Sequence, residues 1–282
     1  MDRSIEKKTL LYIKSVGFGL IIFILAFVNI FPIFWAFSTS LKNNNEIMTI
    51  PPSLIPDNPT LENYERLLDE DILMYTKNSL FTSFGSLAIV LLFGSLAAYG
   101  FARFKFKGKG VFLLIIIAGM TLPLASLVIP LFFIFSKLGM ADKWYTLIII
   151  YTALNLPFCI WALKGYIETI PPSLDKAAMV DGYSRVQALR KVIIPIAAPS
   201  FLTVAIFSLI GSWNDYVLAA TLTSNPQIRT LAVQMRYYLG VWGREWGPLT
   251  GAAVFSTVPV IIVFIFFRHR LISGLTSGAV KG

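Results

Sequence analysis

Six long apolar runs constrain this sequence more than any other feature. Each run is dominated by aliphatic and aromatic residues, and each reaches the roughly 20 residues that a helix needs to cross a bilayer. Apolar residues that come in long runs, and not in short alternating segments, exclude a porin-type barrel. We therefore expect an all-α integral membrane protein with six transmembrane helices, near residues 15–37, 79–101, 111–135, 144–163, 197–220 and 249–267.

Composition leads to the same fold class. Hydrophobic residues make up 56% of the 282 residues and charged residues 14%, whereas soluble proteins average about 25% charged residues. So few charges cannot cover the water-facing surface of a soluble protein of this length. The whole chain, 1–282, is therefore predicted to form a single transmembrane domain.

The net charge of +9 is explained by where the basic residues lie. With the N-terminus inside, the cytoplasmic segments carry twice as many Lys and Arg residues as the external ones, which predicts that both termini are cytoplasmic. The connections 38–78 and 221–248 then lie outside, and 164–196 lies inside. The first apolar run is interpreted as an uncleaved signal anchor. Three tryptophans are predicted to mark the outer membrane boundary: Trp35, Trp144 and Trp213.

The cytoplasmic connection 164–196 has the pattern of a helix, a turn and a second helix. Pro172 suits the start of the first helix, and the pair Asp181-Gly182 is typical of a turn that ends it. The second helix is predicted to run toward Pro195. A stiff two-helix protrusion between spans favours a docking element, and the alternative is a hairpin that rests on the membrane surface.

This hairpin resembles a known motif. The run from Asp175 to Pro195 has the spacing of the EAA motif of bacterial ABC importer permeases, which is EAA, three residues, Gly182, nine residues and then an apolar segment ending in Pro. Together with the segment GSWNDY at 211–216 and the closing GLTSGAVKG, it makes the whole chain similar to the maltose-type carbohydrate permeases. Two residues depart from the motif: Lys176 stands at the usual Glu, and Tyr183 replaces the usual small residue.

The resemblance implies a role and a set of partners. In that family the hairpin is the coupling helix, which seats in a groove of an ATPase subunit and drives alternating access. Two ATPase subunits, a second permease subunit, expected as a heterodimer partner, and an extracytoplasmic solute-binding protein are implied. The residues implied in ATPase coupling are Asp175, Lys176, Ala177, Ala178, Asp181, Gly182, Tyr183, Arg185 and Pro195.

No catalytic residue, metal site or cofactor is expected in this chain. The phosphate-binding motif GxxxxGK[ST] is absent, so ATP and Mg are assigned to the partner ATPase. Neither a nucleophile–base set nor paired carboxylates occur within the spans. The chain is therefore predicted to be a non-enzymatic permease subunit of the bacterial cytoplasmic membrane.

Polar residues in apolar spans are the candidates for the substrate path, because they are costly unless they face a cavity or another helix. Asn or Asp beside Trp or Tyr matches the hydroxyls and apolar faces of a sugar. The alternative is hydrogen bonding between helices, which is favoured for Ser79, Thr82, Ser83 and Ser86. The candidates for the path are Tyr151, Asn155, Trp213, Asn214, Asp215 and Tyr216.

The external connection 221–248 is rich in Arg and aromatic residues, which commonly anchor protein interfaces. The resemblance implies that it contacts the binding protein, and the alternative is a loop on lipid headgroups. The candidate contacts are Arg236, Tyr237, Tyr238, Trp242 and Arg244.

Three interpretations are compared from the residues alone; one of them, a membrane enzyme or structural anchor, is opposed as an enzyme by the missing catalytic groups. The first is a permease subunit of an ATP-driven carbohydrate importer. The alternative is a secondary transporter of a small polar solute, which would be marked by inverted repeats or charge relays within spans. No clear repeat and few mid-span charges are found. The substrate is left open among a sugar, an oligosaccharide and a glycerol phosphate.

Overall fold

The structure is a computed structural model that describes residues 2–240 and 245–279, with the surroundings of side chains given from Val16 to Phe266 outside that gap. Within these residues all regular elements are helices. The chain divides into two compact units, one formed by 1–71 and 237–257 and the other by 72–236 and 258–282. The predicted all-α fold class is confirmed.

The first unit is built around the end of α1 (Asp2–Ser40). It also contains α2 (Asn44–Ile47), α3 (Glu62–Asp69) and the start of α14 (Trp246–Ala279). Buried Asn63 on α3 donates hydrogen bonds to the carbonyls of Ser40 at 3.0 Å and Lys42 at 2.8 Å, and so ties α3 to the end of α1. Gly247 lies so close to Asn63 that a Cβ there would be 2.2 Å from Oδ1.

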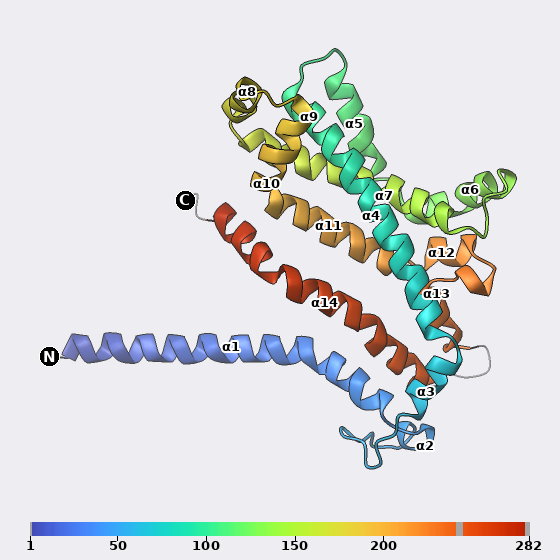
Figure 1. The fold of residues 1–282 in the computed structure, drawn as a ribbon. Coiled ribbons are helices and arrows are strands. Elements are labelled where there is room, and N and C mark those ends of the chain that lie inside the picture. The colour runs from blue at the N-terminus through green and yellow to red at the C-terminus, as the bar shows by residue number, and fades with distance from the viewer. Residues whose placement is uncertain (1, 241–244, 280–282) are drawn as a thin grey trace. The chain divides into compact units, whose positions relative to one another are not determined.

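The second unit has a core of three long helices, α4 (Ile72–Arg103), α7 (Trp144–Thr169) and α11 (Ala198–Trp213), which lie against one another in Figure 1. Small residues let α4 and α7 approach closely, as is common for helices in membranes. A Cβ on Gly94 of α4 would lie 2.4 Å from Sγ of Cys159 on α7, so that crossing requires glycine. Cys159, Leu163 and Val204 are fully buried in the same apolar cluster.

The remaining elements of the second unit are short. They connect the long helices or cap their ends, and two of them are not α-helical: a π-helical turn, Leu189–Ile193, and a 3-10 turn, Pro226–Ile228. The α-helical ones are α5 (Lys109–Gly119), α6 (Leu124–Lys137), α8 (Pro172–Val180), α9 (Arg185–Ala188), α10 (Ile194–Ile196), α12 (Val217–Leu222) and α13 (Leu231–Tyr237).

Four helical segments in the described part of the chain are long and apolar enough to cross a membrane, and two bent helix pairs raise the number to as many as six. The four are Val16–Ser40, Ile72–Arg103, Trp144–Thr169 and Trp246–Phe266. One bent pair is Lys109–Gly119 with Leu124–Lys137, and the other is Arg185–Ile196 with Ala198–Trp213. Every predicted apolar run therefore contributes helix to a candidate span.

Two of the predicted runs are not single straight helices. The run 111–135 bends by 95° between α5 and α6, just before Pro123. Proline disfavours the helical conformation of the residue before it and cannot donate a backbone hydrogen bond, which accounts for the break. The run 197–220 ends as a helix at Trp213, and α12 starts again at Val217.

The predicted bounds of two other spans are too short. The helix α4 begins at Ile72, well before residue 79, and α7 continues to Thr169, beyond residue 163. Hydropathy alone does not find these ends because their polar residues are paired inside the fold. Asn78, for example, donates at 2.9 Å to the carbonyls of both Gln227 and Arg229.

Candidate functional sites: the 172–196 hairpin and the polar contacts of α7 and α11

The segment 172–196 forms the predicted helix–turn–helix. Pro172 begins α8, where its missing N–H costs nothing. At the other end, Gly182 has a left-handed backbone with φ +87°, and its N–H donates to Met179 at 3.1 Å. The N–H of Tyr183 donates to Ala178 at 3.0 Å, which completes a Schellman motif. Gly182 is therefore required by the conformation that ends α8.

The second half of the hairpin starts with a capping box. The backbone N–H of Gln187 donates to Oγ of Ser184 at 3.3 Å, and the N–H of Ser184 donates back to Gln187 Oε1 at 2.8 Å. The π-helical turn 189–193 follows, directly before Pro195. Proline removes one donor and crowds the carbonyl four residues earlier, which disturbs the helical hydrogen bonds in this turn.

Asp175 joins the hairpin to the end of α4. Its carboxylate is 5% exposed and accepts hydrogen bonds from Arg103 Nε at 2.7 Å and from the Tyr99 hydroxyl at 2.9 Å. Arg103 also donates to the carbonyl of Ile170 at 2.9 Å. Asp175 thus lies in the first turn of α8, but its carboxylate is buried in an ion pair within the chain and is not available to an ATPase subunit.

The other motif residues divide by exposure. Ala178 is buried, whereas Lys176, Ala177, Asp181, Gly182, Tyr183, Arg185 and Pro195 are exposed. The Arg185 guanidinium lies 4.8 Å from the ring centroid of Phe104, and the Lys191 ammonium lies 4.7 Å from that of Tyr183. These cation–π contacts hold the turn against the end of α4 and against the second helix.

Three exposed apolar side chains of the hairpin were missed by the sequence reasoning. Val180 is 86% exposed, and Leu174 before it and Val186 after it in the hairpin are exposed too. Their spacing does not form a regular amphipathic stripe, so hydrophobic periodicity gives no signal for them. Tyr99 and Arg103 were also missed, since nothing in the sequence links the end of α4 to Asp175.

Asn155, a polar candidate on α7, is hydrogen-bonded to α11. Asn155 Nδ2 donates to the Tyr151 carbonyl at 2.8 Å and to Ser212 Oγ at 3.2 Å. Ser212 in turn shares a hydrogen bond of 3.4 Å with Ser86 on α4. The three long helices are thus linked by side-chain hydrogen bonds at one level. For Asn155 and Ser86 these are the contacts that the helix–helix alternative describes.

Asp215 lies at the break between α11 and α12. Its carboxylate accepts a hydrogen bond from the hydroxyl of buried Tyr151 at 3.0 Å. It also accepts the N–H groups of Leu218 at 3.4 Å and Ala219 at 3.0 Å, and so caps the start of α12. Asn214 and Tyr216 on either side of it are exposed.

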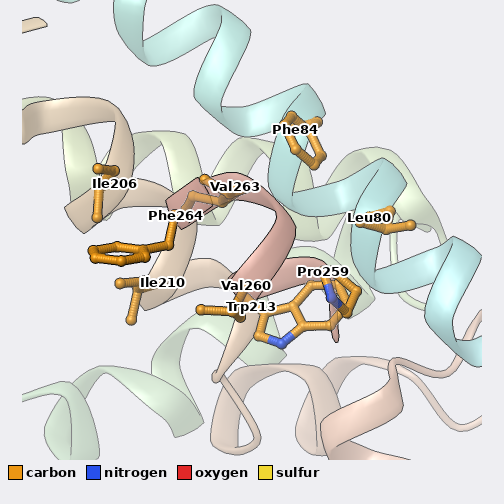
Figure 2. Close-up of a pocket in the computed structure, with 10 residues that line it drawn as sticks. Leu80, Phe84, Ile206, Ile210, Trp213, Pro259, Val260, Val263 and Phe264 are labelled. Carbon is orange, nitrogen blue, oxygen red and sulfur yellow. The ribbon is translucent and has the colours of Figure 1, made fainter. Parts of the chain in front are cut away.

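Trp213 differs from its prediction. It is 5% exposed and lines an apolar pocket of about 220 Å³ with residues of α4, α11 and α14, including Leu80, Phe84 and Pro259 (Figure 2). The burial of Trp213 contradicts a position of its side chain in lipid. Trp144 is exposed, and its place at the outer boundary stays a prediction. The other residues that line the pocket are apolar, so they cannot supply the polar groups that orient a sugar.

The predicted contacts of 221–248 fall into three groups. Arg236 and Tyr237 are exposed. Tyr238 is buried, and its hydroxyl donates to Glu70 at 2.8 Å, so its prediction as an exposed contact is wrong. Trp242 and Arg244 lie outside the described residues.

Comparison with known proteins identifies the family. Residues 90–275 match the family described as "Binding-protein-dependent transport system inner membrane component". The sulfoquinovosyl glycerol transport system permease protein SmoH of Agrobacterium fabrum is 39% identical over 254 residues, which cover 90% of this chain and 89% of that protein. The trehalose/maltose transport system permease protein MalG of Thermococcus litoralis is 32% identical over 286 residues and covers 100% of both chains.

The fold is also that of a solved transporter. A chain from a bacterial ABC transporter involved in the import of the acidic polysaccharide alginate matches with a TM-score of 0.77 and 24% identity, over 92% of this chain and 96% of that chain. The chain therefore belongs to the family of binding-protein-dependent transport system inner membrane components, as the multi-pass permease subunit of an ABC importer.

Proposed function

We propose that this permease carries a carbohydrate, forming half of the translocation path together with a second permease subunit. The identity to permeases named for sulfoquinovosyl glycerol and for trehalose and maltose supports this substrate class. Two ATPase subunits bind ATP and Mg, and a solute-binding protein delivers the substrate. The observation that carries the coupling role is the hairpin 172–196, which is exposed at its turn and anchored by a buried ion pair.

The proposed coupling surface is the exposed side of the hairpin. Val180, Tyr183 and Val186 offer apolar contact area, and Gly182 lets the backbone turn without a side chain. A displacement of this surface is transmitted to α4 through the ion pair between Asp175 and Arg103, in which Oδ2 and Nε are 2.7 Å apart. Because α4 packs along α7 and α11, a displacement of the hairpin is passed to the helices that carry the polar candidates.

The proposed substrate path runs past the break between α11 and α12. Exposed Asn214 and Tyr216 offer an amide and a phenol to a sugar. Behind them, Tyr151, Asn155 and Asp215 hold α7, α11 and α12 together through the hydrogen bonds described above. Trp213 supports the same break from its buried position.

The proposed orientation places both termini and the hairpin in the cytoplasm. The hairpin exposes Lys176, Arg185, Arg190 and Lys191, as expected for an inside segment. The segment with Arg236 and Tyr237 then faces the binding protein, for which Trp242 and Arg244 remain predicted contacts from the sequence.

The test is reconstitution of the chain with its partner subunits in liposomes, with ATPase activity and sugar uptake measured together. We expect ATP-dependent uptake that requires the binding protein, and a marked loss of stimulated ATPase activity in Val180→Asp, because the substitution places a charge in the apolar part of the coupling surface. The matched control is Lys164→Gln, outside that surface. Uptake driven by an ion gradient without ATP would support the secondary transporter instead.

A further inference from the structure

The loop that follows α1 folds back onto the last turns of that helix (Figure 1). The Ser38 hydroxyl donates to the carbonyl of Leu54 at 2.6 Å, and the N–H of Thr60 donates to the carbonyl of Leu41 at 2.8 Å. The buried ammonium of Lys42 donates to the carbonyl of Ser53. The loop 43–60 is thus held at the level of the final residues of the span Val16–Ser40.

The same loop is ordered by its own side chains. The Glu46 carboxylate accepts hydrogen bonds from the Ser53 hydroxyl at 3.0 Å and from the N–H of Asp57 at 2.9 Å. Asn43 caps the short helix α2 by accepting the N–H of Glu46 at 2.9 Å. These bonds close a rigid loop whose tip is 47–56.

The tip is apolar and exposed. Ile50 is 96% exposed and Ile55 is 70% exposed, and Met48 and Leu54 are exposed with them. No charged residue occurs from 47 to 56, whereas Glu46 and Asp57 flank the segment. Several adjoining exposed aliphatic side chains on a rigid loop are unfavourable in water and usually mark an interaction surface.

The position of the tip identifies what covers it. Phe34 and Phe37 near the end of α1 are exposed on a helix that is long and apolar enough to span a bilayer. The Ser38 hydroxyl is bonded to the Leu54 carbonyl, so the apolar tip lies at the level of the last turn of this apolar helix. Trp35 lies one turn before Ser38, and the Lys42 ammonium is 5.0 Å from the centroid of its ring. A tryptophan beside a lysine is typical of the boundary between acyl chains and headgroups.

We propose that the tip 47–56 inserts into the bilayer at the Ser40 end of α1 and anchors this end of the permease to the lipid surface. The partner is the glycerol and upper acyl region of the leaflet, which accepts aliphatic side chains to a depth of about 5–10 Å. Under the orientation proposed above this is the outer leaflet. The loop is therefore a monotopic anchor beside a transmembrane helix.

The test uses the full transporter complex in lipid nanodiscs with nitroxide labels at Ile50→Cys and Ile55→Cys. Labels at Asn44→Cys and Asn58→Cys, exposed positions just outside the tip, are the matched controls. The native Cys159 is buried, and the unsubstituted chain measures its background. Collision rates are compared for oxygen, which concentrates in the hydrocarbon, and for a water-soluble nickel chelate.

We expect oxygen collisions to exceed nickel collisions at positions 50 and 55, and the ratio to reverse at 44 and 58. A label at position 50 that collides mainly with nickel would overturn the proposal, since the tip would then lie in water. Low collision rates with both reagents would also overturn it, because a partner subunit or the binding protein would then cover the tip. If a variant fails to assemble, a bimane label at Met48→Cys, also exposed on the tip, replaces it and is read by quenching from lipids that carry a nitroxide near the glycerol. Absence of quenching there would overturn the proposal.

Discussion

At the scale of single residues, neighbouring side chains of the hairpin have different roles: some are paired inside the chain and others are exposed on its surface. Asp175 and Arg103 are both almost completely buried and satisfy each other, so neither is available to a docking partner. Lys176, the next residue, is exposed. Adjacent positions in a helix point about 100° apart, so one carries an internal role and the other a surface role.

Removing Arg103 should loosen the hairpin. Arg103→Met leaves the Asp175 carboxylate buried without its ion partner, which is expected to cost about 3–5 kcal/mol locally. Hydrogen exchange of 172–188 in the assembled complex measures the effect. Arg190→Met, at an exposed position, is the control and should leave exchange unchanged. Equal exchange in both variants would show that the pair does not hold the hairpin.

Substitutions at Gly182 can distinguish a requirement for its left-handed backbone conformation from a requirement that no side chain be present. A left-handed backbone costs most residues about 1–2 kcal/mol, but Asn tolerates it better. We expect Gly182→Ala to destabilise the turn by about 1 kcal/mol and Gly182→Asn by less. Stimulated ATPase activity is then measured in both variants. Activity retained in Gly182→Asn and partly lost in Gly182→Ala would show that the backbone conformation matters. Equal loss in both variants would show that a side chain at this position blocks docking.

At the scale of elements, close helix crossings and one folded-back loop shape the molecule. The crossing of α4 and α7 depends on Gly94 facing Cys159, and the loop after α1 depends on Glu46. Neither feature follows from hydropathy. The first is a contact between residues of two different apolar runs, and the second is a contact within a polar connection.

Gly94→Ala should destabilise the packing of α4 on α7. The new Cβ would lie 2.4 Å from Cys159 Sγ, and such overpacking costs typically 1–3 kcal/mol. Thermal unfolding of the purified complex measures it. Gly100→Ala on the same helix, where nothing lies within 4 Å, is the control. The double variant Gly94→Ala/Cys159→Ala should recover part of the loss, and no recovery would assign the cost to a different contact.

The loop after α1 should loosen in acid. The hydrogen bond from the Asp57 N–H is the main cause that lowers the pKa of Glu46 below its ordinary value of 4.5. The stabilisation is therefore complete above about pH 4.5 and is lost as the pH falls through the lowered value. Nitroxide mobility at Ile50→Cys should rise below this range, and Glu46→Gln should abolish the pH dependence. A response unchanged by Glu46→Gln would assign the transition to another group.

At the scale of the whole molecule, the distribution of charge predicts which side each connection faces. Segments with an excess of Lys and Arg usually remain in the cytoplasm. The hairpin, which carries Lys176, Arg185, Arg190 and Lys191, is therefore predicted to lie inside.

The predicted orientation can be measured with cysteine labels in intact cells. A membrane-impermeant maleimide should label Asn58→Cys from outside, and Arg190→Cys should react only after the membrane is opened. Both positions are exposed in the structure. The reverse pattern would place the hairpin outside and remove it from any cytoplasmic ATPase.

The sequence alone was sufficient for the fold class, the number of apolar runs, the helix–turn–helix and the family, because each of these depends on local patterns. A bilayer requires long apolar helices, and a turn requires Gly182, whatever lies elsewhere in the chain. A proline such as Pro123 indicates an irregularity in its apolar run, but no local pattern gives the 95° bend.

Only the tertiary structure decided which polar residues are internal and which are exposed. Asp175, Tyr151 and Tyr238 read as surface or path residues, yet each one bonds to a partner distant in sequence, at Arg103, Asp215 and Glu70. The same holds for Ile50 and Leu54, whose apolar character has a meaning only once the loop is seen bonded to Ser38. The partners of a side chain depend on how segments that are distant in sequence pack together, and a local sequence pattern contains no information about that packing.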